Sequence, residues 1–188
     1  MQVSKFLPPG SDSPPGLCAA DIRRATPADR LPLARMLELY QYELSDIWDQ
    51  DLDAHGEYGY ELDRFWRDPA CHAFVATVAG CYAGLALVDG SSRVGNAGPG
   101  GHWMNQFFVL KKYRRLGLGR QLARAVFEAL PGPWEVGQMS LNYAAQGFWR
   151  QVVAEVAGGQ YQEHVLRSGP WQGVVQVFQS PVRRAPSA

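Results

Sequence analysis

The segment from Phe107 to Arg124 has the composition of a phosphate-binding turn. An apolar stretch leads into a basic turn that contains Gly117 and Gly119, and an amphipathic stretch follows. The unpaired N–H groups and the dipole of a helix N-terminus bind phosphate oxygens, and glycine lets the backbone approach the ligand closely. Residues 111–124 add six cations and no acid, namely Lys111, Lys112, Arg114, Arg115, Arg120 and Arg124. The segment therefore predicts a ligand that carries phosphate groups.

Two common phosphate motifs are excluded in this segment. The sequence has no GxxxxGK(S/T), and a GxGxxG pattern fails because Leu122 stands where the third glycine is needed. The remaining pattern is RxxGxG, which Arg114, Gly117 and Gly119 form. Taken alone, this pattern is also compatible with a plain basic turn whose cations face solvent.

A second motif makes the pattern more specific. Tyr113 precedes RxxGxG, and Asn142, Ala145 and Phe148 form NxxAxxF on a later helical segment. With both motifs on the expected elements, the sequence resembles the GNAT acetyltransferase family across residues 20–180. In that family the central motif is (Q/R)xxGx(G/A) after a strand, often with a tyrosine in front of it.

The resemblance implies acetyl-CoA as co-substrate and no metal, with the cofactor bound in a V-shaped cleft between two splayed central strands. Backbone groups of the strand end would bind the pantetheine arm, and the amides of the basic turn would hold the pyrophosphate. Asn142 would hydrogen-bond the pantetheine or lie near the thiol. The residues so assigned to the cofactor are Phe108, Val109, Leu110, Arg114, Arg115, Leu116, Gly117, Leu118, Gly119, Arg120, Asn142 and Phe148.

The groups that would move protons depart from the family pattern. Trp149 stands where many members have a tyrosine that protonates the leaving thiolate, and the fourth strand lacks the family's glutamate. Glu135 and His102 are the remaining candidates for a general base, acting through water. The alternatives are that Glu135 faces solvent and that His102 ends a loop. Without such a base, the enzyme would rely on positioning and on proton transfer through solvent.

The acceptor side is predicted to be acidic and aromatic. Residues 38–68 contain ten acids and two arginines, so their net charge is minus eight. Carboxylates and interleaved aromatic rings suit an organic cation, although most acids in such segments are solvated surface. By resemblance, Tyr42, Glu43 and Asp46 are the substrate-binding candidates. The expected acceptor is a small cationic amine, with a protein α-amine as the less favoured alternative.

These residues require a single mixed α/β domain at residues 20–182, between flexible tails at 1–19 and 183–188. The expected fold is a GNAT-like mixed central sheet flanked by helices, in the order β-α-α-β-β-β-α-β-α-β-β. Strands are predicted at 20–25, 72–78, 81–88, 103–110, 134–139, 160–166 and 174–179. Helices are predicted from Pro27 to about Glu43, through Tyr60, Phe65 and Trp66, after Gly119, and at 142–153. The parallel part is expected around residues 103–139.

Composition narrows the function classes. The 188 residues hold 18 Lys and Arg against 18 Asp and Glu, which argues against a nucleic-acid-binding protein. No apolar run approaches the length of a membrane helix, and the first twenty residues lack the apolar block of a secretory signal. Three cysteines without metal spacing suggest reduced thiols. We therefore expect a cytoplasmic protein that contacts no membrane. A homodimer paired through the apolar strand Val174–Phe178 is possible, and a catalytically silent acyl-CoA-binding or interaction domain is the alternative function.

Overall fold

A computed structural model describes residues 20–95, 100–169 and 171–181, so the expected tails at 1–19 and 183–188 lie outside the described residues. The strands are β1 (Ala20–Arg24), β2 (His72–Val78), β3 (Cys81–Asp89), β4 (His102–Val109), β5 (Gly132–Met139), β6 (Tyr161–Leu166) and β7 (Gly173–Ser180). The helices are α1 (Arg30–Trp48), α2 (Arg64–Arg67), α3 (Leu118–Ala129) and α4 (Tyr143–Val156), with short 3-10 turns at Pro27–Asp29 and Lys111–Tyr113. The predicted order of strands and helices is confirmed.

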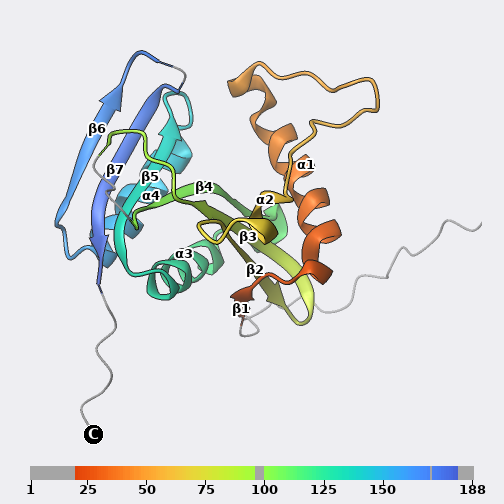
Figure 1. The fold of residues 1–188 in the computed structure, drawn as a ribbon, viewed down its shortest axis with the longest axis horizontal. Helices are drawn as coiled ribbons and strands as arrows, with labels where there is room; N and C mark the ends of the chain where they lie inside the picture. The colour runs from red at the N-terminus through yellow and green to blue at the C-terminus, as the bar shows by residue number, and fades with distance from the viewer. Residues whose placement is uncertain (1–19, 96–99, 170, 182–188) are drawn as a thin grey trace, which may run out of the picture.

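One seven-stranded sheet of order β1-β2-β3-β4-β5-β7-β6 runs through the molecule. Figure 1 shows β1 to β4 beside α1 in one half of the view and β5 to β7 in the other. Only β4 and β5 are parallel, and their pairing is limited to His102 with Trp134 and Trp103 with Glu135. Beyond Trp103 the two strands separate, which confirms the predicted parallel unit and opens the centre of the sheet.

The two faces of the sheet carry separate hydrophobic cores. On one face, α3 and α4 bury residues such as Leu122, Val126 and Val153 against β2 to β5 and β7. On the other face, α1 and the α2 region bury Leu33, Leu37 and other apolar side chains against β2, β3 and β4. Each helix thus presents an apolar stripe to the sheet.

The first two helices differ from the sequence prediction. α1 continues to Trp48, and the second helix is a single turn at Arg64–Arg67. Between them, residues 49–63 form an irregular segment in which the Glu38 carboxylate accepts hydrogen bonds from the N–H groups of Tyr58 (2.8 Å) and Gly59 (3.2 Å). These bonds satisfy the backbone N–H groups of Tyr58 and Gly59 outside any helix.

The predicted dimer strand is corrected by the topology. Strand β7 pairs with β5 along one edge and with β6 along the other, so Val174–Phe178 has no free edge for a second chain. Among the described residues, no helix combines the length and apolar character that crossing a membrane requires.

Candidate active site

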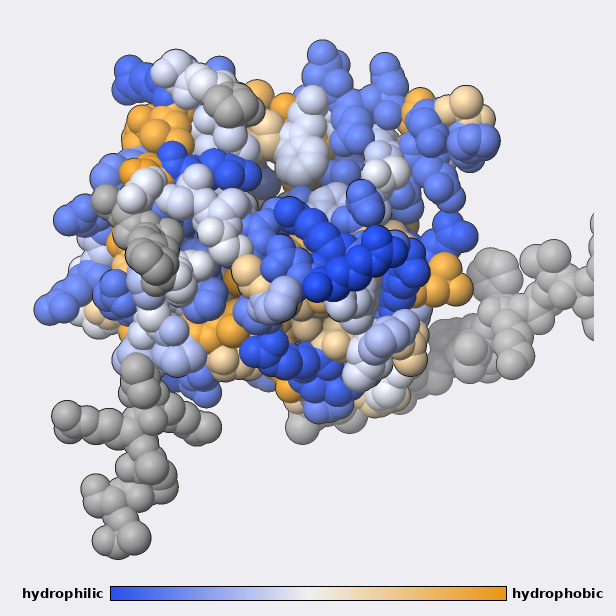
Figure 2. Space-filling view, viewed as in Figure 1, coloured by the Kyte–Doolittle hydropathy of each residue, from blue (hydrophilic) through white to orange (hydrophobic). Residues whose placement is uncertain are grey.

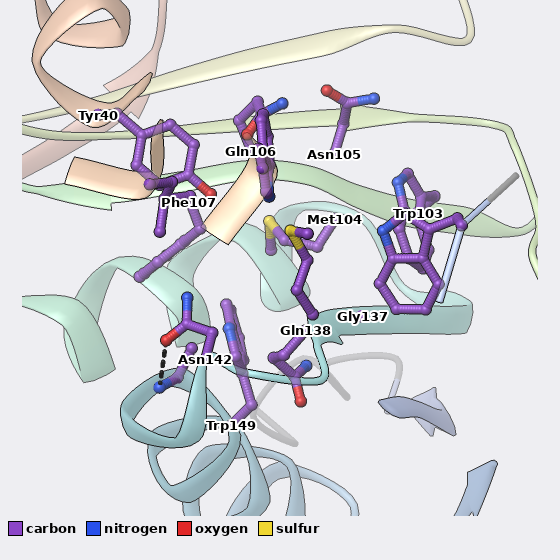
Figure 3. A pocket seen from close by; sticks show the side chains of 15 residues that line it. Tyr40, Trp103, Met104, Asn105, Gln106, Phe107, Gly137, Gln138, Asn142 and Trp149 are labelled. Carbon is purple, nitrogen blue, oxygen red and sulfur yellow. Dashed lines mark hydrogen bonds between the residues drawn. The ribbon is translucent and has the colours of Figure 1, made fainter. Parts of the chain in front are cut away.

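A cavity of about 120 Å³ lies where β4 and β5 separate (Figure 3). Helix α1 forms one wall, the start of α4 forms the opposite wall, and the segment between β6 and β7 contributes a tryptophan. The lining residues are Tyr40, Leu44, Trp48, Trp103, Met104, Asn105, Gln106, Phe107, Gly137, Gln138, Met139, Asn142, Ala145, Trp149 and Trp171. The cavity is therefore largely aromatic, with amide side chains as its polar groups.

A β-bulge at Asn105 shapes the β4 side of the cavity. Leu87 pairs with Gln106 and Val88 pairs with Met104, so Asn105 is an extra residue on β4. A bulge shifts the alternation of side chains by one position. Phe107 consequently packs in the α3–α4 core with Met104, whereas Phe108 packs in the α1 core.

Hydrogen bonds hold Asn105 on both sides. Its Oδ1 accepts from the Tyr60 hydroxyl (2.5 Å), and its Nδ2 donates to Asp89 Oδ2 (2.7 Å). Asp89 is buried and also accepts from Arg64 Nη2 (2.7 Å). Burial raises the pKa of Tyr60, so its hydroxyl keeps the proton that it donates. This network ties the α1–α2 segment to the bulge.

Helix α1 contributes Tyr40, Leu44 and Trp48, which lie at i, i+4 and i+8 on one face. The Tyr40 ring packs against Phe108 with 5.4 Å between the centroids, and its hydroxyl points into the cavity in Figure 3. Burial raises the pKa of Tyr40, because the phenolate would lose its hydration. The indole Nε1 of Trp48 is buried and has no hydrogen-bond partner among the described residues.

Gly137 allows two tryptophans to pack over β5. Trp103 and Trp171 meet edge to face, with 5.7 Å between their ring centroids. A Cβ placed on Gly137 would lie 2.9 Å from Trp171 Cη2 and closer still to Trp103 Cη2. The cavity wall therefore depends on glycine at this position.

The predicted phosphate turn has the backbone that it requires. Gly117 is the N-cap of α3 with φ of 84°, and Arg115 also has a positive φ of 61°. The first intrahelical bond runs from Gln121 N to Gly117 O (3.1 Å), so the N–H groups of Leu118, Gly119 and Arg120 precede it. Leu116 lies in the same turn.

The backbone groups at the end of β4 are partly engaged. The Leu110 N–H donates to Ala83 O (2.9 Å), and its carbonyl accepts from Tyr113 N (2.9 Å). The structure thus leaves Leu110 no free backbone group for the pantetheine. In an antiparallel strand, the backbone N–H and C=O groups of successive residues point to opposite neighbouring strands, so residues two apart point to the same strand. Because the backbone groups of Leu110 point to β3, those of Phe108 point to β3 as well. The backbone groups on the β5 side therefore belong to Phe107 and Val109.

Arg114 closes this end of the strand. Its own N–H is bonded to Lys111 O (3.2 Å), and its side chain donates to Val109 O (2.7 Å) and to Glu43 Oε2 (2.6 Å). The Arg114 amide is therefore not among the free N–H groups of the turn.

The second motif lies against the first. Asn142 caps α4 through Oδ1, which accepts from Ala145 N (3.1 Å), and its amide nitrogen is on the cavity side in Figure 3. Phe148 stacks on Phe107 with 5.8 Å between the centroids, and a Cβ on Gly119 would touch the Phe148 ring at 3.4 Å. Trp149 is buried in the α3–α4 core and also lines the cavity.

The two base candidates lie where β4 and β5 are still paired, so the structure does not bring them to the cavity. Glu135 is fully buried, so the alternative that it faces solvent is wrong. Its carboxylate accepts from Ser92 Oγ and from the N–H groups of Arg93 (2.6 Å) and Val94 (3.3 Å). The His102 ring packs 5.0 Å from Trp134 between centroids, and burial lowers the pKa of His102.

None of the three acceptor candidates lines the cavity. Tyr42 and Asp46 are exposed on α1, and Glu43 forms ion pairs with Arg114 (2.6 Å) and Lys111 (3.8 Å). The acidic segment and the basic turn therefore touch each other. Figure 2 shows mostly hydrophilic residues over the end of α1 and the segment that follows.

The sequence prediction missed the α1 residues that line the cavity, because it followed charge. The i, i+4, i+8 spacing of Tyr40, Leu44 and Trp48 in the sequence could have indicated them. No comparable signal marks Trp171 or the bulge at Asn105. Among the described residues, no cluster of three or more His, Cys, Asp or Glu side chains could hold a metal ion.

Comparison with known proteins identifies a family and a fold. The model of the acetyltransferase (GNAT) family matches residues 34–152. No curated protein matches the sequence at a significant level.

Solved structures resemble the chain in fold at low sequence identity. An acetyltransferase from Thermus thermophilus is 16% identical with a TM-score of 0.62, covering 87% of this chain and 99% of that one. An aminoglycoside acetyltransferase in complex with coenzyme A is also 16% identical with a TM-score of 0.62, covering 86% of this chain and 95% of that one. The spermidine N-acetyltransferase from Vibrio cholerae, in complex with CoA and spermine, is 12% identical with a TM-score of 0.56. The match covers 86% of this chain and 95% of that one.

Proposed function

Because the chain belongs to the acetyltransferase (GNAT) family, we propose that it transfers the acetyl group of acetyl-CoA to a primary amine by direct attack in a ternary complex. The observation that carries this proposal is the cavity between the separating strands β4 and β5. It borders the cap of α4 on one side and α1 on the other, so a donor and an acceptor can meet there. The structural neighbours with bound CoA support the same cofactor.

The turn before α3 fits the pyrophosphate of acetyl-CoA. Gly117 adds no side chain at the cap, and the N–H groups of Leu118, Gly119 and Arg120 precede the first intrahelical bond. Positive charge from Arg115 adds to the field of the helix dipole, whereas Arg120 is paired with Glu155 (3.2 Å).

The pantetheine arm fits between the end of β4 and the start of α4. The Val109 N–H is the donor on the β5 side, since the Val109 carbonyl accepts from Arg114 Nε. Asn142 would donate from Nδ2, because its Oδ1 caps α4. The stacked rings of Phe107 and Phe148 would cover the arm and exclude water.

Bound acetyl-CoA supplies a thioester whose carbonyl carbon accepts the amine. In this chain, Phe107 and Trp149 would pack beside the reacting atoms and keep bulk solvent away. The indole N–H of Trp149 is too weak an acid to protonate a thiolate, so the thiolate proton comes through solvent. Positioning then supplies most of the rate.

The finer proposal is that the acceptor is a small amine that reaches the site as a cation. The acids Asp46, Asp49 and Asp51 are exposed at and after the end of α1, near Trp48 in the chain. Their field would attract a cation toward the aromatic wall of the cavity.

Cys71 and Cys81 are free thiols, which supports our further proposal of a cytoplasmic protein.

The test is acetyl-CoA binding by calorimetry, followed by thiol release with a panel of amines. Gly119→Val should abolish binding, because the new side chain would crowd Phe148 and the helix N-terminus. Gly147→Val is the matched control, since a Cβ on Gly147 meets nothing within 4 Å. Undiminished affinity in the Gly119 variant, with both proteins folded, would refute the proposed cofactor site.

The alternative is a catalytically silent acyl-CoA-binding domain. It is favoured by the absence of any carboxylate or imidazole among the described residues that line the cavity. Tight acetyl-CoA binding without acceptor-stimulated thiol release would select this alternative.

A further inference from the structure

The cavity between β4 and β5 is uncharged. Of the fifteen described residues that line it, Tyr40 alone carries a side chain that titrates. Among the described residues, the cavity thus has no anionic partner for an ammonium ion.

Three carboxylates on the elements around the cavity are engaged by other partners. On α1, Glu43 pairs with Arg114 and Lys111. Behind β4, Asp89 pairs with Arg64 and accepts from Asn105.

On β5, the Glu135 carboxylate is occupied by the segment Ser92–Val94. An ammonium ion that entered the cavity would lose its hydration without gaining a carboxylate.

The polar groups that remain suit a neutral amine. Gln106 is 8% exposed, and its Oε1 is buried without a hydrogen-bond partner among the described residues. A carbonyl oxygen of this kind accepts one N–H bond. Burial raises the pKa of Tyr40, so its hydroxyl, which points into the cavity in Figure 3, stays neutral. Aromatic faces from α1, β4 and the β6–β7 segment would enclose an apolar body.

We propose that the cavity takes the reacting amine in its uncharged form, and that its acceptors are weakly basic primary amines on an apolar or aromatic body. This inference rests on the proposed function and names the substrate class of the same site. The amine can reach the rim as a cation, loses its proton to solvent there and enters neutral. The C–N bond then forms, the C–S bond breaks, and the proton that nitrogen releases passes through solvent to the thiolate.

Amine basicity makes the inference measurable. An α-amino group titrates near pH ~7.7 and an alkylamine such as lysine near ~10.4. At pH 7 the neutral fraction of the first is about 400 times that of the second, and at pH 9 it is about 25 times. The preference for the weaker base should therefore fall more than tenfold between these pH values.

The experiment compares L-phenylalaninamide with phenethylamine, which share a ring and differ in basicity, by thiol release from acetyl-CoA with the full-length protein. We expect kcat/KM at pH 7 to favour phenylalaninamide at least tenfold, with the ratio falling about 16-fold by pH 9. A peptide that begins with phenylalanine, run in parallel, separates a polypeptide terminus from a small molecule as the source.

Gln106 offers matched variants. Gln106→Glu brings a carboxylate into the cavity and should raise the rate with phenethylamine at pH 7. The ratio of kcat/KM for phenylalaninamide to that for phenethylamine should therefore fall. Gln106→Leu should raise KM for phenylalaninamide and leave the pH dependence of the ratio unchanged.

A ratio that does not vary with pH, or a preference for phenethylamine at pH 7, would overturn the inference. So would acetyl-CoA binding without turnover of either amine, in which case the cofactor assignment stands. A protein that binds no acetyl-CoA would instead refute the proposed function.

Discussion

Gly137→Ala should destabilise the protein and deform the cavity together. The added Cβ would lie 2.9 Å from Trp171 Cη2 and closer to Trp103 Cη2, and contacts under 3.0 Å force a shift. Trp103 is 4% exposed and its ring is rigid, so the shift cannot be absorbed by a flexible chain end. Overpacking of this kind costs about 1–3 kcal/mol, which for a chain of this size lowers Tm by about 2–12 °C.

Thermal unfolding followed by circular dichroism measures the first effect, and thiol release at varied acceptor concentration measures the second. KM for the acceptor should rise more than Kd for acetyl-CoA, because the proposed pyrophosphate turn at the N-terminus of α3 lies outside the cavity lining. Gly147→Ala is the control. Its Cβ meets nothing within 4 Å, and alanine favours a helix over glycine by about 1 kcal/mol, so Tm should hold or rise. An unchanged Tm in Gly137→Ala would refute the packing of the two tryptophans.

Three further predictions concern polar contacts. Glu135→Gln should lower the free energy of unfolding by about 1–3 kcal/mol, because the amide keeps one acceptor oxygen for three donors. The pH–rate profile of this variant should keep its shape. Loss of one limb of the profile would instead identify Glu135 as a general base. Arg114→Met should weaken acetyl-CoA binding by calorimetry about tenfold, since Arg114 holds Val109 O and Glu43, whereas Arg124→Met farther along α3 should not. The Arg23 guanidinium, at 2.8 Å, holds the pKa of Asp29 well below its usual range, so this stabilisation is present above about pH 4 and lost as the pH falls further. The Tm gap between the protein and Asp29→Asn should therefore shrink from pH 7 to pH 3, and a gap that grows toward acid would contradict the pairing.

The fold was predictable because its elements carry local signals. The Ala79-Gly80 dipeptide between two β runs predicted the β2–β3 hairpin, and both residues have the positive φ that such a turn needs. Pro131, Gly132 and Pro133 ended α3 near the expected place. The second helix is shorter than predicted, and the irregular chain before it is held by the Glu38 carboxylate, which accepts from backbone N–H groups about twenty residues away. A single local window does not contain that contact.

Candidate-site residues could be placed from the sequence where they belong to one continuous motif. Gly117, Gly119 and Asn142 occupy the helix ends that their motifs required. The roles of Glu43 and Glu135 were less accessible, since each carboxylate is claimed by a partner from another part of the chain. Tyr40 and Trp48 carry no charge, so the search for acids passed over them.

The sequence by itself determined the elements and the phosphate turn, because a glycine-containing turn before an amphipathic helix is a local property of the chain. Only the tertiary structure decided what surrounds the cavity between β4 and β5. The bulge at Asn105 changes which side chains of β4 face α1, and ion pairs hold Glu43 at the basic turn, outside the cavity lining. The acids that make residues 38–68 negative are thus separate from the uncharged cavity, because burial favours aromatic and amide groups over unpaired charge.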